Sequence, residues 1–249
     1  MRSKIVPVTN VSRLTEAANA LLERAPGMPG MGLIHGETGY GKTTAVTWLI
    51  TRVNGVYVRA LATTTPSSLL AGIARELDLQ PRPSNVQTVE AIVQKLAITG
   101  RPLFIDEADY LVENKRTVET LRDIHDLATV PVVLIGMAGI QRRIQSRQQL
   151  TGRIAQWVEF QPCSFEDVQA LSRELAEVGI ADDILKRVYE LTRGSVRLIV
   201  VALNRIEGYA RARGLSAIAL KDWPANADFF LGNAPRATQP RAKPALAAV

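Results

Sequence analysis

The stretch GETGYGKT, Gly36–Thr43, follows the apolar run MGLIH directly and decides the fold of this chain. It matches the pattern G-x-x-x-x-G-K-[ST] at every fixed position. Glycines allow positive φ angles and a close approach of the backbone, so that successive N–H groups can point at phosphate oxygens. A helix that begins near Lys42 would add its positive dipole end. The sequence therefore predicts a site for the phosphates of a nucleotide.

The side chains of this loop have distinct expected roles. We expect Lys42 to reach the β- and γ-phosphates and the Thr43 hydroxyl to hold Mg²⁺. ATP and Mg²⁺ are therefore the predicted cofactors. The predicted nucleotide-binding residues are Gly36, Glu37, Thr38, Gly39, Tyr40, Gly41, Lys42, Thr43 and Thr44.

A second candidate feature is the acidic pair in RPLFIDEAD, residues 101–109. The apolar residues Leu103–Ile105 predict a buried strand whose carboxyl end presents Asp106 and Glu107. Successive strand residues face opposite ways, so one carboxylate can bind Mg²⁺ while the next polarises the attacking water. We predict Asp106 as the metal ligand and Glu107 as the general base. A small-molecule kinase is disfavoured, because the sequence shows no acceptor pocket.

The alternation of apolar runs with helical patterns predicts the fold class. Strand-like runs without period-2 alternation are typical of a mainly parallel sheet that helices cover on both faces. They lie at residues 31–36, 55–60, 101–109, 130–137 and 156–160. Helical patterns lie at about 43–53, 66–78, 86–98, 115–128 and 138–147. A further helix from Ser12, as N-cap, to about Arg24 would precede the first strand.

The pattern changes near residue 162, where strand signals stop. Ser164 and Asp167 resemble a capping box, and helical patterns follow at about 165–178, 182–193 and 195–213. We therefore predict an α/β nucleotide-binding core with an N-terminal helix over residues 1–162 and a small all-helical lid over 163–232. The basic, Pro/Ala-rich tail, 233–249, is predicted to be disordered in isolation. The aromatic stretch DWPANADFFLG is expected to dock on the lid, on a neighbouring subunit or on a partner.

Charge and composition suggest the partner class and the compartment. The net charge is +6, and basic residues without acidic ones gather in residues 140–153 and 233–249. A polyanion such as nucleic acid and an ordinary solvated surface explain this pattern equally well. No apolar run approaches the roughly 20 residues that cross a bilayer, so no membrane partner is expected. The single cysteine, Cys163, excludes an internal disulfide and suits the cytoplasm.

Taken together, the loop, the acidic pair and the element order resemble the AAA+ ATPases over roughly residues 5–215. The resemblance implies a five-stranded parallel sheet followed by a helical lid. It also implies catalytic roles for Arg153 of QQLTGRI, as an arginine finger that acts on a neighbouring subunit, and for Arg197 of TRGSVRLIVVALNR, as sensor 2. Arg147 is the alternative finger. The sensor 1 position holds Gly136 and Met137, where these proteins usually have a polar residue.

Within that family the chain resembles the transposition regulators typified by phage Mu B protein, TnsC and TniB. The matching stretches are GMGLIHGETGYGKTTAV, LFIDEADYL and TLRDIHDLATVPVVLIGMAGIQRRI. The resemblance implies a helical filament that coats duplex DNA in the cytoplasm of a bacterial or phage-infected cell and recruits a transposase. Slow, assembly-dependent ATP hydrolysis would dismantle it. By position, the candidate DNA-backbone contacts are Thr64, Thr65, Arg82, Lys115 and Arg116.

Two other functions stay open at this point. A helicase loader or initiator-like replication ATPase would have the same nucleotide site, and we would expect a winged helix or single-strand contacts, neither of which the sequence indicates. An ATP-switched protein scaffold would bind no DNA at all. Duplex binding that depends on both ATP and salt separates the predicted function from the scaffold.

Overall fold

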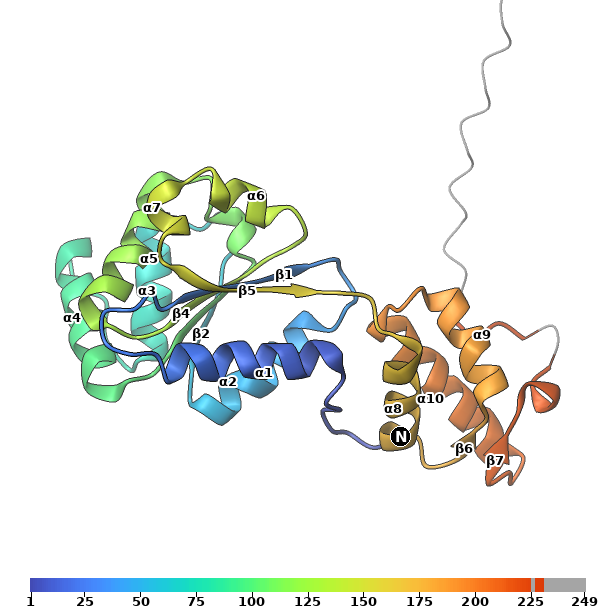
Figure 1. Cartoon of the computed structure of the whole chain (residues 1–249). Helices are drawn as coiled ribbons and strands as arrows, with labels where there is room; N and C mark the ends of the chain where they lie inside the picture. The colour runs from blue at the N-terminus through green and yellow to red at the C-terminus, as the bar shows by residue number, and fades with distance from the viewer. Residues whose placement is uncertain (225–226, 231–249) are drawn as a thin grey trace, which may run out of the picture.

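The computed structural model describes residues 1–224 and 227–230. The predicted tail, 233–249, lies outside this range. The chain has an α/β part built around one sheet, and a helical part that follows it (Figure 1). Among the described residues, none of the helices combines the length and the apolar character that a bilayer crossing needs.

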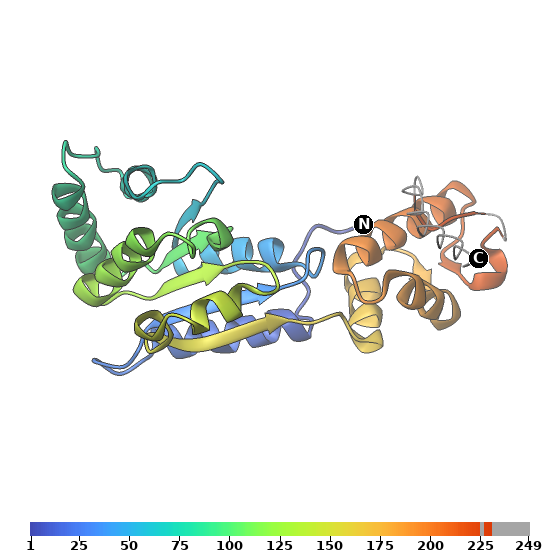
Figure 2. The same cartoon turned by 90° about the horizontal axis from the view of Figure 1, so that it is seen from above.

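The sheet has five parallel strands, as predicted, in the order β2-β3-β4-β1-β5. Strands β1, β3 and β4 are buried along their whole length, which explains their continuous apolar runs. Because the strands are parallel, the carboxyl ends of β1 and β3 lie at the same edge, and Figure 2 shows the helical part beside this edge. The strands are β1 (Met31–Gly36), β2 (Val56–Arg59), β3 (Leu103–Asp106), β4 (Val132–Ile135) and β5 (Ile154–Phe160).

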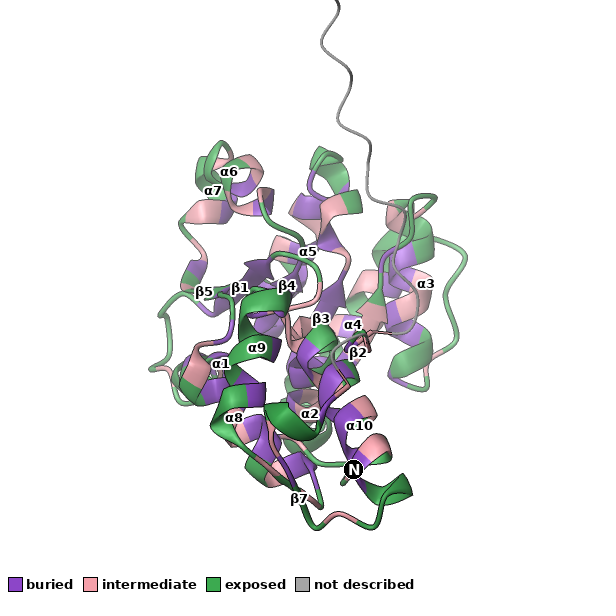
Figure 3. Ribbon diagram, turned by 90° about the vertical axis from the view of Figure 1, so that its right-hand side faces the viewer, coloured by how far each residue is buried: buried purple, intermediate pink, exposed green. Residues whose placement is uncertain are grey.

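Helices cover both faces of the sheet. Along β1, Leu33 and Ile34 belong to two different apolar clusters, because successive strand residues point to opposite faces. Helices α1 (Thr9–Leu22) and α2 (Lys42–Val53) pack on the Ile34 side, below the sheet in Figure 1. The Leu33 side is covered by α3 (Pro66–Glu76), α4 (Asn85–Thr99), α5 (Lys115–Ala128), α6 (Ile140–Gln145) and α7 (Gln148–Thr151). Figure 3 shows the strands buried between exposed outer helix surfaces.

The predicted cap of the first helix is wrong. Helix α1 begins at Thr9 rather than after Ser12, and its N-cap residue, Val8, has no side chain that could accept a hydrogen bond. The Asp167 Oδ1 atom accepts from the Thr9 backbone N–H at 2.9 Å and from the Thr9 hydroxyl at 3.1 Å. A carboxylate 158 residues away therefore does the work of a local cap.

The C-terminal part is built from α8 (Phe165–Leu175), α9 (Asp182–Thr192) and α10 (Val196–Ala212). The predicted capping box is present, with the Ser164 and Asp167 side chains each accepting from the other's backbone N–H. Two short parallel strands, β6 (Gly179–Ile180) and β7 (Ala217–Ile218), also occur in this part, which is therefore not wholly helical. Strands of two residues are too short to leave a periodic pattern in a sequence.

The aromatic stretch after α10 docks on this chain's own helical part. Trp223 and Phe229 are buried and stack with their ring centroids 4.9 Å apart. Tyr209 of α10 lies 4.9 Å from the Trp223 ring. The cluster closes the hydrophobic core of the C-terminal part, as one of the three sequence-based alternatives expected.

Candidate nucleotide-binding site

The glycine-rich loop joins β1 to α2 and requires glycine at its first fixed position. Gly36 has a φ of 145°, and a Cβ atom there would lie 2.5 Å from the Phe160 carbonyl oxygen. Strand β5 therefore leaves no room for a side chain. Lys42 is the first residue of α2, and the Gly41 N-cap has a left-handed backbone. The loop thus turns sharply at the end of a buried strand into a helix N-terminus, as the motif predicts.

The Lys42 side chain lies inside this loop. Its Nζ atom donates to the carbonyl oxygens of Gly36, at 2.6 Å, and Glu37, at 2.8 Å. Burial lowers the pKa of Lys42, and the nearby carboxylates of Glu37 and Asp106 act in the opposite direction. The ammonium is therefore held against the backbone of the loop that is predicted to bind the phosphates.

The acidic pair follows β3 at the same edge of the sheet. Asp106 is buried, and its Oδ2 atom accepts from the Tyr57 hydroxyl at 2.7 Å. Burial raises the pKa of Tyr57, and the bond to Asp106 adds to the rise. Glu107 lies beyond the strand with a φ of 54°, a conformation that costs a non-glycine residue about 1–2 kcal/mol. Its carboxylate contacts the Arg59 guanidinium at 3.1 Å.

Two contact residues of the acidic pair escaped sequence analysis. Tyr57 and Arg59 are two residues apart on β2, so their side chains leave the same face of that strand. Strand β2 pairs with β3 so that Arg59 lies opposite Asp106. The alternation within VYVR indicates that Tyr57 and Arg59 share one face of β2. Their contacts with the acidic pair could be predicted only if β3 were known to lie next to β2 in the sheet.

These groups converge on one cavity of about 840 Å³, a volume in the range of small-molecule sites. The cavity is lined by Thr38–Thr44, Asp106, Glu107 and Arg197. Gly36 and Glu37 do not line it, but their carbonyl oxygens accept hydrogen bonds from Lys42. Its wall also includes apolar side chains from the N-terminal segment, α2, α8 and α10, which suit the flat face of a base. These are Ile5, Val6, Val8, Trp48, Leu171, Leu175, Val196 and Val200.

The same cavity contains a suitable donor set for Mg²⁺. The Thr43 hydroxyl and the Asp106 carboxylate are oxygen ligands of the kind that Mg²⁺ prefers. Among the residues that the structure describes, no cluster of three or more His, Cys, Asp and Glu forms a metal site. Mg²⁺ does not need such a cluster, because it usually binds one or two carboxylates together with substrate phosphates and water.

The helical part reaches the glycine-rich loop through the start of α10. The Arg197 backbone N–H donates to the Gly39 carbonyl at 3.1 Å, and the Ser195 hydroxyl lies 3.5 Å from the same oxygen. Because Arg197 lines the cavity, the predicted sensor 2 residue is next to the candidate phosphate site of its own chain.

The two candidate arginine fingers lie elsewhere. The Arg153 carbonyl accepts from the N–H of Met31, the first residue of β1, whereas the glycine-rich loop follows the last. Strand β1 spans six residues, so the two ends are about 16 Å apart, beyond the reach of an arginine side chain. The Arg153 guanidinium instead pairs with Asp126 at 2.9 Å and lowers the pKa of that carboxyl. Arg147 donates to the Glu113 carbonyl at 3.1 Å.

The candidate DNA contacts differ in how free their side chains are. The Thr64 hydroxyl accepts from the Leu61 N–H, and the Thr65 hydroxyl caps α3. The remaining three candidates are exposed and form no ion pair among the described residues, which leaves their charges available to a partner. They are Arg82, Lys115 and Arg116.

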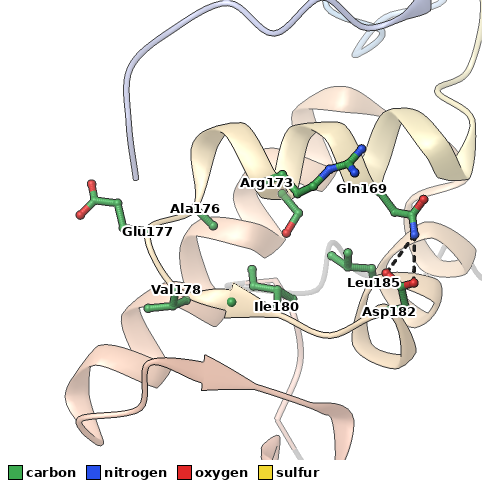
Figure 4. Close-up of a pocket in the computed structure, with 10 residues that line it drawn as sticks. Gln169, Arg173, Ala176, Glu177, Val178, Ile180, Asp182 and Leu185 are labelled. Carbon is green, nitrogen blue, oxygen red and sulfur yellow. Dashed lines mark hydrogen bonds between the residues drawn. The ribbon is translucent and has the colours of Figure 1, made fainter.

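A second cavity, of about 530 Å³, lies between α8, β6 and α9 (Figure 4). Arg173, Glu177 and Asp182 contribute charged groups, and the Gln169 amide donates to Asp182 at 2.9 Å. None of the predicted site residues lines this cavity.

Comparisons with known proteins agree with this geometry. Residues 27–144 match a family model described as "AAA domain". Replication factor C small subunit 2 of Pyrobaculum aerophilum is 29% identical over 186 residues, which cover 73% of this chain and 54% of the relative. The chain thus spans about half the length of that curated relative.

Two solved structures share the fold at 18% sequence identity. The Aeropyrum pernix ORC1 protein in complex with DNA has a TM-score of 0.59, with 86% of this chain and 62% of that chain covered. The ADP form of the Aeropyrum pernix ORC2 protein has a TM-score of 0.65, with 88% and 67% covered. The chain thus has the P-loop AAA+ fold, and residues 27–144 are similar to the family described as "AAA domain".

Proposed function

We propose that this chain binds ATP with Mg²⁺ and hydrolyses it to ADP and phosphate. The observation that carries the proposal is the convergence of the glycine-rich loop, the acidic pair and Arg197 on one cavity. Thr43 and Asp106 would hold Mg²⁺, which neutralises charge on the phosphates. Glu107 takes a proton from the attacking water, the water oxygen bonds to the γ-phosphorus, and the bond from phosphorus to the ADP oxygen breaks.

The proposal assigns complementary roles to two cations of this site. Lys42 lies against the loop carbonyls, from which its ammonium can turn to the β- and γ-phosphates. Arg197 adds positive charge from the helical part, so its position couples the nucleotide to that part of the chain.

We further propose that the chain assembles with copies of itself. Arg153 is too far from its own cavity to act there, and its side chain is 40% exposed. The bond to Asp126 holds the guanidinium at the surface, where a neighbouring subunit's nucleotide can meet it. A finger supplied in this way makes hydrolysis depend on assembly, because it stabilises charge that develops in the transition state.

In our proposal these copies form a helical filament on duplex DNA, and the filament presents that DNA to a transposase. The motifs shared with transposition regulators support this choice. The exposed side chains of Arg82, Lys115 and Arg116, which form no ion pair with another described residue, also support it. Contacts of this kind to the phosphate backbone carry no sequence preference.

A second candidate is a replication ATPase of the initiator or loader type. The similarity to a replication factor C subunit and to the ORC proteins favours it. The two candidates share the nucleotide chemistry and differ in the assembly: a continuous filament along duplex DNA, or discrete complexes at few positions.

Electron microscopy of the chain on long duplex DNA, with ATP, ADP or no nucleotide, tests the proposal. We expect filaments with ATP only, and fewer of them as salt rises. Discrete complexes would favour the replication ATPase, and absence of DNA binding would leave the protein scaffold. Lys42→Ala should abolish nucleotide binding and filaments together, with Lys186→Ala on the exposed side of α9 as control. Normal hydrolysis by Lys42→Ala would overturn the assignment of the glycine-rich loop as the ATP site.

Mixing variants tests the role of Arg153. Arg153→Ala and Lys42→Ala should each be inactive alone. Their mixture should recover part of the hydrolysis, because a Lys42→Ala subunit, which forms no filament by itself, can still supply the finger to the ATP held by a neighbouring Arg153→Ala subunit. No recovery would assign Arg153 a structural role through Asp126. Glu107→Gln should bind ATP normally and keep filaments on DNA; rapid disassembly would remove Glu107 from the general-base role.

A further inference from the structure

The end of β4 has no polar side chain of its own, and a carboxylate from another element fills the space beside it. Gly136 follows the strand directly. A Cβ atom at Gly136 would lie 2.6 Å from the Asp109 Oδ2 atom and 2.5 Å from the Ile140 Cδ1 atom. The isoleucine methyl group could move away, but the carboxylate is bonded on both oxygens. Glycine is therefore required here because Asp109 occupies the place of a side chain.

Asp109 belongs to the short 3₁₀ turn Ala108–Tyr110 that follows the acidic pair. Its Oδ2 atom accepts from the Met137 backbone N–H at 2.7 Å. Its Oδ1 atom accepts from the Arg143 guanidinium of α6, which also lies 3.4 Å from the Asp109 carbonyl. Only 14% of the Asp109 side chain is exposed. One carboxylate thus ties the segment after β3 to the end of β4 and to α6.

The tied segment borders the candidate site. Gly136 and Met137 line the same cavity as Lys42, Asp106 and Glu107. The Met137 N–H points to Asp109, so the turn after β4 has its position set by a residue that lies two positions after the proposed general base. A shift of this turn would change the shape of the cavity next to the acidic pair.

We propose that Asp109 is a positioning residue for hydrolysis and that Arg143 holds it in place. The carboxylate fixes the position of the turn at Gly136 and Met137, which lines the cavity beside the acidic pair. The residue that follows β4, Gly136, has no side chain that could do this. Arg143 neutralises the carboxylate and fixes its orientation from α6. The inference rests on the proposed ATPase function, because it concerns the rate of that reaction.

The expected effect is on the rate and not on nucleotide binding. A displacement of about 1 Å near reacting groups can cost up to about 100-fold in rate, so we expect Asp109→Ala to lower kcat by about 10- to 100-fold. Asp109 does not line the cavity, so the Kd of fluorescent ADP should stay within about twofold. Asp109→Asn keeps an oxygen that can accept from the Met137 N–H, and it should recover much of the rate.

The experiment combines kinetics with residue-resolved amide hydrogen exchange. Wild type, Asp109→Ala, Asp109→Asn and Arg143→Ala are compared, with Glu90→Ala on the exposed side of α4 as control. The Met137 amide should exchange faster in Asp109→Ala than in wild type and be protected again in Asp109→Asn. We expect Arg143→Ala to lower kcat less than Asp109→Ala, because the bond to Met137 survives.

The outcomes separate a failure of the positioning role of Asp109 from a failure of the proposed ATPase function. Unchanged Met137 exchange in Asp109→Ala, or an unchanged kcat, would overturn the role of Asp109. A parallel loss of kcat, ADP affinity and thermal stability that Asp109→Asn does not restore would also overturn it, since a merely structural residue behaves in that way. A wild-type chain that binds no nucleotide would overturn the proposed function instead, and the exchange measurement still tests the contact.

Discussion

Replacing Gly194 with alanine should destabilise this protein strongly. Gly194 precedes the Ser195–Arg197 contact with the glycine-rich loop and has a φ of +77°. An added Cβ atom would lie 2.7 Å from the Pro162 Cβ atom and 2.8 Å from both the N and the O atoms of Cys163. Two of these neighbours are backbone atoms, so no change of rotamer can relieve the contact.

The magnitude follows from two separate costs. A left-handed conformation costs an L-residue about 1–2 kcal/mol. Forcing an extra methyl group into a filled space costs about 1–3 kcal/mol more. We therefore expect Gly194→Ala to lower the free energy of unfolding by about 2–5 kcal/mol, a large share of the stability of an ordinary domain.

Gly208→Ala is the matched control because it changes the same residue type in the following helix. Gly208 is exposed within α10, and apart from its chain neighbours and the nearby backbone of its own helix, no atom of the described residues lies within 4 Å of an added Cβ. Alanine in a helix interior is favoured over glycine by about 0.5–1 kcal/mol, so this variant should be more stable than wild type.

Urea denaturation followed by circular dichroism measures both effects. The two glycine variants should change stability in opposite directions. Gly194→Ala within about 0.5 kcal/mol of wild type would refute the reasoning, because ordinary surface substitutions stay inside that range. A large loss in Gly208→Ala would refute the assignment of the cost to the contact with Pro162 and Cys163.

Three further predictions concern the site and the buried titratable groups. Arg59→Ala should raise basal phosphate release by roughly 1.4- to 5-fold, because a half-exposed ion pair of about 0.2–1 kcal/mol no longer holds Glu107; a slower rate would contradict this. Burial lowers the pKa of His35 and His125, so the unfolded chain binds protons first as pH falls below about 6.5. Unfolding free energy should then drop by up to about 1.4 kcal/mol per pH unit for each histidine, and less steeply in His125→Gln. Burial raises the pKa of Cys163 to about 12, so iodoacetamide at pH 8 should label this thiol only after denaturation; labelling of the folded chain at the rate of a free peptide would contradict its burial.

Local chemistry made much of the fold and half of the site predictable. The glycines and Lys42 stand at spacings that only a phosphate loop explains well, and that loop is complete within eight residues. The five strands were predicted from continuous apolar runs, because a strand covered on both faces has no polar side. Asp106 and Glu107 were predicted for the same reason, since Asp106 ends one of these strands and Glu107 follows it directly.

Contacts between distant segments were not predictable in this way. The cap of α1 is Asp167 and not Ser12, because the helical part places that carboxylate beside Thr9. Strand alternation predicted that Asp106 binds the metal and that Glu107 acts as the base. Glu107 itself, however, follows the strand end with a left-handed backbone, and its carboxylate contacts Arg59.

The amino-acid order alone determined which residues form the phosphate loop, the strands and the acidic pair, because backbone preference and burial act on neighbouring residues. Packing alone decided what surrounds them. Tyr57, Arg59 and Asp109 contact residues that line the cavity only once strands β2, β3 and β4 lie side by side. Gly136 shows the difference most clearly: its missing side chain is a departure from a family pattern in the sequence and a steric requirement in the folded chain.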